Sequence, residues 1–377
     1  MDFTLSDEQK MLRHGAERYL SENYDFEKRK ALIERDHGFS ESQWRQFAEM
    51  GWLALPIPED CDGLGGGFVD ITLMQELFGR RLVLEPFATT AILSAFLLDG
   101  CEDKELRSST LRSIAAGDTR IALACSEDES RYDLARVSTR ALPGDGGFSL
   151  SGRKIAVWDA TCAHKLIVSA VVEGELAPSL FLVARDAGGV VEHSYPLIDS
   201  THAADYDLDA APATLLIASG RALPRLEHAV DRLVLARVAE TLGIIEMVME
   251  ITADQLRNRS QFGQTLSKFQ ALQHRMAEMF VEVQEARSIL YRGIAMIDAA
   301  AGVREAAVSA AKVVATGAGR IVGAQGIQLH GGVGMTDEYP VGHYFKRLLS
   351  LEKQYGDMDH HVKRIARSYR GAESGAR

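Results

Sequence analysis

Cysteine is scarce in this 377-residue chain, and long apolar runs are missing. The four cysteines form no Cys-x-x-Cys pair, so we expect neither a disulfide framework nor a zinc site but reduced thiols in a cytoplasm. No run approaches the roughly 18 apolar residues that cross a bilayer. The opening MDFTLSDEQK lacks the basic and apolar regions of a signal peptide. The sequence therefore predicts a soluble, cytoplasmic protein without a membrane partner.

Positive charge is also in deficit, with 42 Lys and Arg against 53 Asp and Glu and a net charge of −11. A surface of this sign repels the phosphate backbone, which argues against a nucleic-acid partner. Hydrophobic residues make up 46% of the chain, as in an ordinary globular protein with a large core. The length predicts two or three packed units rather than one domain.

Three segments differ in their patterns. Residues 1–119 are mainly helical, and residues 222–377 carry long helical patterns. Between them, residues 120–221 contain short Val-, Ile- and Leu-rich runs separated by turn clusters such as PGDGG. Because helical patterns are missing between these runs, a mostly antiparallel sheet is favoured over a βαβ arrangement. We predict an α+β fold, mainly α: a helical domain, a small β domain and a long-helix bundle.

Two long C-terminal helices can be outlined in more detail. Ser267 and Gln270 match a capping box at the start of the first. The second, AAVSAAKVVATGAGRIVGAQGIQL, is rich in small residues, and Gly331 and Gly332 are expected to end it. The first helix carries an apolar stripe at a spacing of three and four residues: Phe269, Leu272, Met276, Met279, Val283, Ala286 and Leu290.

Three stretches imitate binding motifs. The stretch at 147–154, GFSLSGRK, resembles a phosphate loop but lies between predicted strands, and we interpret it as a hairpin turn. The stretch at 317–323, GAGRIVG, has no preceding strand and is better explained by helix packing. The adjacent histidines of DMDHH, at 357–361, cannot readily share one helix face, so we expect a solvated helix end and no metal.

Two further stretches combine helix ends, glycines and donor side chains. RNRSQFGQTLSKFQ contains Arg259 and Gln270, and QGIQLHGGVG contains Gln328. Exposed amides at helix ends form cradles for a diphosphate, although ordinary turns between helices have the same composition.

These two stretches carry a resemblance to the acyl-CoA dehydrogenases. RSQFGQTLSKFQ resembles the family's Arg-x-x-Phe-Gly segment and the helix after it, and QLHGGVG resembles its Gln-x-x-Gly-Gly-x-Gly motif. The likeness extends over essentially the whole chain. It implies an FAD-dependent flavoprotein of lipid metabolism that oxidises an acyl-CoA thioester to the 2,3-enoyl-CoA. It also implies an electron-transferring flavoprotein as acceptor and a tetramer arranged as a dimer of dimers, homo- or heteromeric.

The resemblance also implies cofactor-binding residues. Arg259, Phe262 and Gln270 match positions that contact FAD from one subunit, and Gln328 and Gly332 match the diphosphate region across the interface. Ser126 matches the threonine of the Thr-Glu-Pro loop beside the flavin ring. This sequence departs most from the family at the Trp-x-Thr-Asn motif. Ala156 stands at the tryptophan position and Trp158 at the threonine position. Further matches are Asp231, near a position for the CoA moiety, and Asp357, at the threonine of a Tyr-Glu-Gly-Thr motif.

That motif raises the question of the catalytic base. The base takes a proton from the carbon next to the thioester carbonyl, and many relatives supply it as the glutamate of Tyr-Glu-Gly-Thr. Tyr355 stands at this glutamate here, and an unperturbed phenol, with a pKa of about 10, is a poor base at neutral pH. A second position for the glutamate, as in isovaleryl-CoA dehydrogenase, reads Leu233. Both expected carboxylates are missing.

Two main explanations stay open at the level of sequence, beside a different flavin reaction or no activity. Another acid has taken over, with Glu240, Asp231 and Asp357 as candidates, or the chain is the non-catalytic, FAD-supporting half of a hetero-oligomer. The ending VGHYFKRLLSLEKQYGDMDHH resembles the small subunit of bacterial pimeloyl-CoA dehydrogenase and the two-gene dehydrogenases of steroid side-chain CoA esters. In such pairs the partner subunit supplies the base.

Overall fold

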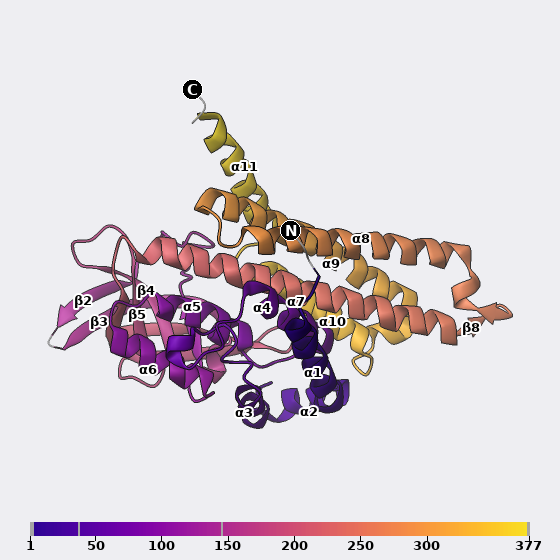
Figure 1. Ribbon diagram of the computed structural model, residues 1–377, viewed down its shortest axis with the longest axis horizontal. Coiled ribbons are helices and arrows are strands. Elements are labelled where there is room, and N and C mark those ends of the chain that lie inside the picture. Colours follow the sequence, from indigo (N-terminus) through magenta and orange to yellow (C-terminus); the bar gives the residue numbers. More distant parts are fainter. Residues whose placement is uncertain (1–3, 37, 145, 375–377) are drawn as a thin grey trace. The chain divides into compact units, whose positions relative to one another are not determined.

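The computed structural model describes residues 4–36, 38–144 and 146–374, and the chain forms two compact units. One unit comprises Met1–Lys30, Thr72–Val83 and Val234–Arg377, and the other comprises Ala31–Ile71 and Leu84–Leu233. Each unit combines segments that are distant in sequence, as the colours of Figure 1 show. The domain boundaries expected after residues 119 and 221 stay a proposal.

The first unit is helical. Among its described residues, the apolar stripe of α8 is buried in its second half, at Met279, Val283, Ala286 and Leu290. The helices are α1 (Asp7–Asn23), the start of α2 (Phe26–Asp36), most of α4 (Phe68–Arg81) and α7 (Ala222–Asn258), α8 (Gln270–Met296), α9 (Ala301–His330), α10 (Pro340–Lys353) and α11 (Met358–Ser374).

The small residues of α9 let its neighbours approach closely, as the sequence predicts. A Cβ at Gly323 would lie 2.6 Å from Phe345 Cδ2 in α10, and one at Gly326 would lie 2.5 Å from Val248 Cγ1 in α7. The helix ends at His330 because Gly331 takes a left-handed conformation with φ of 66°. The predicted stop is confirmed.

Two glycines allow α4 and α7 to cross almost backbone to backbone. A Cβ at Gly243 would lie 1.9 Å from Glu76 O, and one at Gly79 would lie 2.1 Å from Glu240 O. Neither position leaves room for a side chain, so this crossing fixes the part of α7 that carries Glu240.

The second unit contains helices and all but two of the described strands. Its helical segments are α3 (Glu41–Glu49), η1 (Glu59–Cys61), the π-helical η2 (Ala88–Ser94), α5 (Ala95–Asp99), α6 (Lys104–Ala115) and η3 (Ala160–Cys162). Its strands are β1 (Ile121–Ala124), β2 (Arg140–Gly144), β3 (Gly147–Trp158), β4 (Lys165–Val172), β5 (Ser179–Ala184), β6 (Val190–Pro196) and β7 (His202–Ile217).

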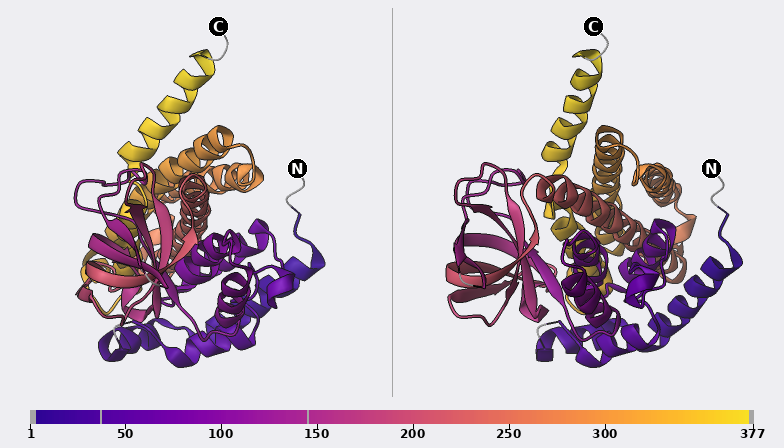
Figure 2. Two further views of the ribbon diagram at one scale, coloured as in Figure 1. Left: turned by 90° about the vertical axis from the view of Figure 1, so that its left-hand side faces the viewer. Right: turned by 60° about the vertical axis from the view of Figure 1, so that its left-hand side comes forward.

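The seven strands form one curved sheet that closes on itself (Figure 2). The order β4-β2-β3-β7-β5 returns to β4, and a core of apolar side chains that includes Leu150, Leu166 and Phe181 fills it. Most pairs are antiparallel, as expected, whereas β1–β4 and β2–β4 are parallel. The predicted hairpin turn at 147–154 is wrong, because these residues belong to β3, and Gly152 bends the strand at a register shift.

None of the described helices is long and apolar enough to cross a membrane.

Candidate functional site

The position expected for a catalytic glutamate lies in a tight turn between α10 and α11. Tyr355 takes a left-handed conformation with φ of 54°, and Gly356 follows with φ of 122°. A Cβ at Gly356 would lie 2.5 Å from His361 Nε2 and 2.7 Å from His360 Cδ2. The tyrosine is partly buried, and its hydroxyl oxygen is shielded from solvent. The turn thus holds a phenol, and no carboxylate, at this position.

Two buried titratable side chains support the turn. Lys312, on α9, donates from Nζ to Leu351 O at 2.5 Å and Gln354 O at 3.4 Å, the carbonyls at the end of α10. Burial, together with the charge of Arg237, lowers the pKa of Lys312 to about 7. His361 lies 3.1 Å from Ser309 Oγ through Nδ1, and burial lowers its pKa to about 2. The turn is anchored by a lysine and a neutral imidazole.

His361 also corrects a prediction. The adjacent histidines were expected to mark a solvated helix end, yet His361 is 1% exposed. Only one of two adjacent residues can face the neighbouring helix, and α11 turns His361 toward α9. Among the described residues, no group of His, Cys, Asp or Glu is arranged to hold a metal ion.

Asp357 and Glu240 are both engaged in hydrogen bonds. Asp357 Oδ1 accepts from the backbone N–H of His360 at 3.0 Å, at the start of α11. The buried Glu240 carboxylate accepts from Arg237 Nη1 and Arg347 Nε, each at 2.7 Å. Burial alone would raise the pKa of Glu240, but Arg347 and Arg237 outweigh it and hold the pKa below its ordinary value. A carboxylate stabilised in this way is a poor proton acceptor.

The remaining acid candidate belongs to the other unit. Asp231 lies on the part of α7 that is assigned to the second unit, and its side chain is buried. Leu233, two residues further along, is also buried.

Apart from Asp357, the predicted cofactor-binding residues of the first unit lie at two exposed ends. At one end, β8 (Ser260–Gln261) and β9 (Gln264–Thr265) form a hairpin that projects beyond α7 and α8 in Figure 1. Phe262 sits at its tip with φ of 53° and is 90% exposed, and its ring lies 6.2 Å from that of Phe269. Leu266 N donates to Arg259 O at 2.9 Å, so the hairpin brings the exposed Arg259 close to the start of α8.

The start of α8 differs from the predicted capping box. A short 3₁₀ turn (Leu266–Lys268) intervenes, and Phe269, which has no polar side chain, occupies the N-cap. Ser267 Oγ lies 3.1 Å from Thr265 Oγ1 instead, so the capping box is wrong. The first turn of α8, beginning with the exposed Gln270, therefore keeps backbone N–H groups that no side chain caps.

The second exposed end is the C-terminus of α9. Gln328 and Gly332 are exposed, and a Cβ built on Gly332 meets no atom within 4 Å. The buried His330 holds this end in place, with Nδ1 2.7 Å from Gly326 O and Nε2 3.2 Å from the Tyr339 hydroxyl. Open backbone beside exposed amide donors fits an anionic group such as a diphosphate.

The residues predicted to lie beside the flavin belong to the second unit. Ser126 follows β1, and its carbonyl accepts from Ile155 N at 2.9 Å, so β3 lies directly beside it. Ala156 takes a left-handed conformation with φ of 49°, and its N–H donates to Asp205 Oδ1 at 3.0 Å. Trp158, which matches the threonine position of the family motif, ends β3.

The chain matches two family models, one for the N-terminal domain of acyl-CoA dehydrogenases over residues 6–118 and one for their C-terminal domain over 226–369. The chain belongs to the acyl-CoA dehydrogenase family. This confirms the resemblance seen in the sequence, the helix–sheet–helix fold and FAD as the family's cofactor. It supports an oxidoreductase that acts on carbon–carbon single bonds.

Several relatives of this family resemble the chain along most of its length. The acyl-CoA dehydrogenase IpdE2 of Mycobacterium tuberculosis is 27% identical, covering 91% of this chain and 92% of the relative. The structure of a Tcur3481–Tcur3483 steroid acyl-CoA dehydrogenase variant is 28% identical, covers 99% of this chain and all of that one, and has a TM-score of 0.89. The structure of acyl-CoA dehydrogenase from Geobacillus kaustophilus is 22% identical, covers 98% of this chain and 100% of that chain, and has a TM-score of 0.90. At this identity it supports the fold alone.

Sequence reasoning missed two buried side chains beside the predicted flavin surface. Glu127 directly follows Ser126, and Lys154 directly precedes Ile155, and the two form an ion pair. The polar stretch that precedes Lys154 in β3, which includes Ser151 and Arg153, carries no local signal for a buried lysine.

Proposed function

We propose that this chain is the FAD-supporting subunit of a heteromeric acyl-CoA dehydrogenase and carries no catalytic base of its own. The assembled enzyme would convert an acyl-CoA thioester to the 2,3-enoyl-CoA and pass electrons to an electron-transferring flavoprotein. Its form would be a cytoplasmic tetramer arranged as a dimer of dimers. The observation that carries the proposal is Tyr355, locked with Gly356 into the turn where a glutamate is expected.

The state of the acid candidates supports this reading. Glu240 is paired with two arginines, and Asp357 accepts a backbone N–H at the start of α11. The two arginines lower the pKa of Glu240 and occupy its carboxylate oxygens, which disfavours its removing a proton from carbon. A steroid acyl-CoA dehydrogenase built as a Tcur3481–Tcur3483 pair is among the similar structures, which is compatible with a heteromer.

The role of this chain's own residues would be to hold the cofactor. Arg259, Gln270 and Gln328 would donate to the FAD diphosphate, with the open backbone at Gly332 allowing close approach. Phe262 would supply a flat apolar surface, Ser126 would face the flavin ring, and Asp357 would lie near it. When bound, FAD supplies the acceptor for the hydride that leaves the carbon β to the thioester carbonyl. The proton from the α-carbon would go to a carboxylate of the partner subunit.

The test is an anaerobic titration of the purified chain, reconstituted with FAD, with a panel of saturated acyl-CoAs. We expect a flavin absorption band that does not bleach, because hydride transfer requires simultaneous loss of the α-proton. Bleaching would contradict the proposal and would mean that the chain has a base. Asp231→Asn would then be the first variant to examine, with Glu240→Gln as its control.

A further inference from the structure

A buried ion pair lies behind the predicted flavin surface of the second unit. Lys154 is fully buried in β3, and its Nζ lies 2.6 Å from Glu127 Oε1 and 3.0 Å from Ser169 Oγ. Burial alone would raise the pKa of Glu127, but the charge and hydrogen bond of Lys154, with the donors of Ser138, lower it to about 2. Burial lowers the pKa of Lys154, and the charge and hydrogen bond of Glu127 oppose that shift, so the two side chains form an ion pair inside the sheet domain.

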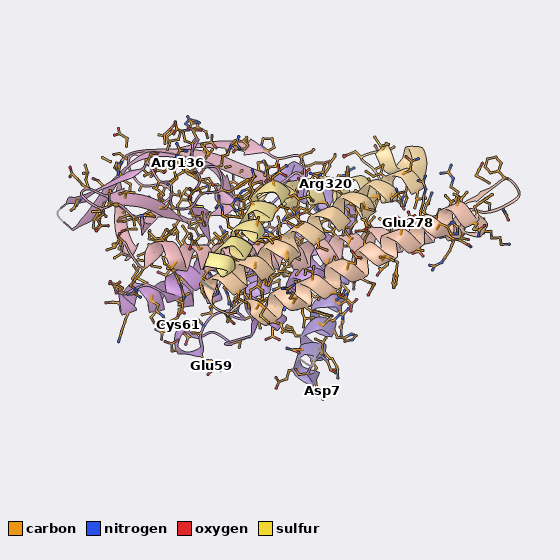
Figure 3. All side chains as sticks on the ribbon, turned by 90° about the horizontal axis from the view of Figure 1, so that it is seen from above. Asp7, Glu59, Cys61, Arg136, Glu278 and Arg320 are labelled. Carbon is orange, nitrogen blue, oxygen red and sulfur yellow. The ribbon has the colours of Figure 1, made fainter. Side chains whose placement is uncertain are left out.

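Glu127 also closes a loop. Its Oε2 accepts from Ser138 N at 2.7 Å and from the Ser138 hydroxyl, and its Oε1 accepts from Thr139 N at 3.1 Å and Thr139 Oγ1 at 2.7 Å. The excursion between residues 127 and 139, on which Arg136 is labelled in Figure 3, thus begins and ends on one carboxylate. Both oxygens are saturated by donors, so the carboxylate has one stable position.

The residue that precedes Glu127 in the sequence, Ser126, is expected beside the flavin ring. Ile155, which follows Lys154, donates its N–H to the Ser126 carbonyl. Directly after that bond, the pairing of β3 with β7 shifts register between Lys154 and Val157, and Ala156 turns left-handed within the shift. Such a bulge redirects the side chains that follow it, here Trp158.

We propose that Glu127 and Lys154 are a positioning pair, which clamps the Ser126 loop to the bulge of β3 and so fixes Ser126 and Trp158 as one rigid surface for the flavin ring. The pair touches no substrate and acts through its neighbours. A buried charge pair costs desolvation that an apolar pair would avoid, and its directional bonds give in return a defined geometry. This inference rests on the proposed function for the identity of the ring, but its geometric part is independent of FAD.

The first measurement needs no cofactor. The chain has three tryptophans, Trp44, Trp52 and Trp158, so the full chain labelled with 5-fluorotryptophan should give three ¹⁹F signals, with Trp158 assigned by Trp158→Phe. In Lys154→Met we expect the Trp158 signal to shift or split while the other two stay in place. Thr139→Val, which removes one bond to Glu127 and keeps the side-chain shape, should shift it less in the same direction.

The second measurement is the affinity of the same folded variants for FAD. Quenching of flavin fluorescence reports the binding. We expect the dissociation constant of Lys154→Met to rise at least tenfold. The matched control is Asp199→Asn, because Asp199 is another buried carboxylate of this unit that accepts from a backbone N–H and a hydroxyl, both of Thr201. It should leave both readouts unchanged.

The outcomes separate the two proposals. The positioning pair would be overturned if folded Lys154→Met gave the Trp158 ¹⁹F signal at its wild-type position. If Lys154→Met does not fold, the same result in Thr139→Val would overturn it. A shifted Trp158 signal in a chain that takes up no FAD would support the clamp and contradict the proposed function. A tenfold loss of affinity in Asp199→Asn as well would mean that FAD binding follows general stability and would also overturn the inference.

Discussion

The turn that carries Tyr355 and the hairpin that carries Phe262 belong to the same unit, yet they are built in opposite ways. The turn is packed under His361 and tied to Lys312, with no room for one methyl group at Gly356. The hairpin tip is 90% exposed at Phe262, and the nearby start of α8 lacks a side-chain cap. Uncapped backbone N–H groups and exposed apolar surface at the hairpin are open to another molecule, whereas the turn is filled by its own side chains.

The largest difference between the two regions should appear in Gly356→Ala. Its Cβ would meet His361 and His360 in a left-handed conformation, so we expect a loss of about 3 kcal/mol in the free energy of unfolding. Chemical denaturation measures this. Gly332→Ala, in open space at the end of α9, is the control and should change stability by no more than about 0.5 kcal/mol. Equal losses would contradict the contrast between closed and open regions.

Arg347→Met should have the next largest effect, because it leaves Glu240 buried with a single arginine. We expect a loss of about 3 kcal/mol near neutral pH. The pKa of Glu240 is lowered in the folded state, so its stabilising contribution is present above the unfolded pKa and is lost as pH falls through the folded value. The difference in the free energy of unfolding between wild type and variant should therefore become smaller on acidification. A gap that widens would mean that Glu240 is not ionised. The exposed pair of Arg18 with Glu22 provides the control, Arg18→Met.

Lys312 should make the free energy of unfolding depend on pH in alkaline solution. Its pKa is lowered to about 7 in the folded state, so the unfolded chain binds more protons above that pH and stability should rise with pH toward 9. The slope from this group is at most about 1.4 kcal/mol per pH unit. Lys312→Met should remove that slope. Parallel pH profiles of the two proteins between pH 7 and 9 would show that Lys312 stays charged when folded.

The smallest change in stability is expected at the hairpin. Phe262→Ala should alter the free energy of unfolding by no more than about 0.5 kcal/mol, because the ring is exposed. The same change should weaken FAD binding about tenfold, the equivalent of 1.4 kcal/mol. Met11→Ala removes another exposed apolar side chain, 68% exposed on α1, and should affect neither quantity. Unchanged FAD affinity in Phe262→Ala would remove the hairpin from the cofactor site.

Local patterns were sufficient for the elements that depend on local chemistry. The long helices, the glycine stop after His330 and the antiparallel character of the sheet follow from periodicity, glycine and turn residues. The family motifs indicated the exposed donors Arg259 and Gln328, which the structure places at helix and hairpin ends.

Two errors arose where contacts between residues distant in sequence decide the structure, and a third has a local cause. His361 is buried because α9 lies beside it, and Lys154 is tolerated inside a strand because Glu127, distant in sequence, neutralises it. The capping box failed because a 3₁₀ turn moves the start of α8 to Gln270. Sequence periodicity does not reveal which residue from elsewhere in the chain will become a contact in the folded protein.

The absence of a catalytic base is tested most directly by comparing wild type with Tyr355→Glu in the anaerobic acyl-CoA titration of the FAD-loaded chain. We expect the wild-type flavin band to persist with every saturated acyl-CoA, because no carboxylate takes the α-proton. Tyr355→Glu places a carboxylate at that position and is expected to give slow bleaching. Bleaching of the wild type at the rate of the variant or faster would show that this chain is a self-sufficient dehydrogenase with a base elsewhere.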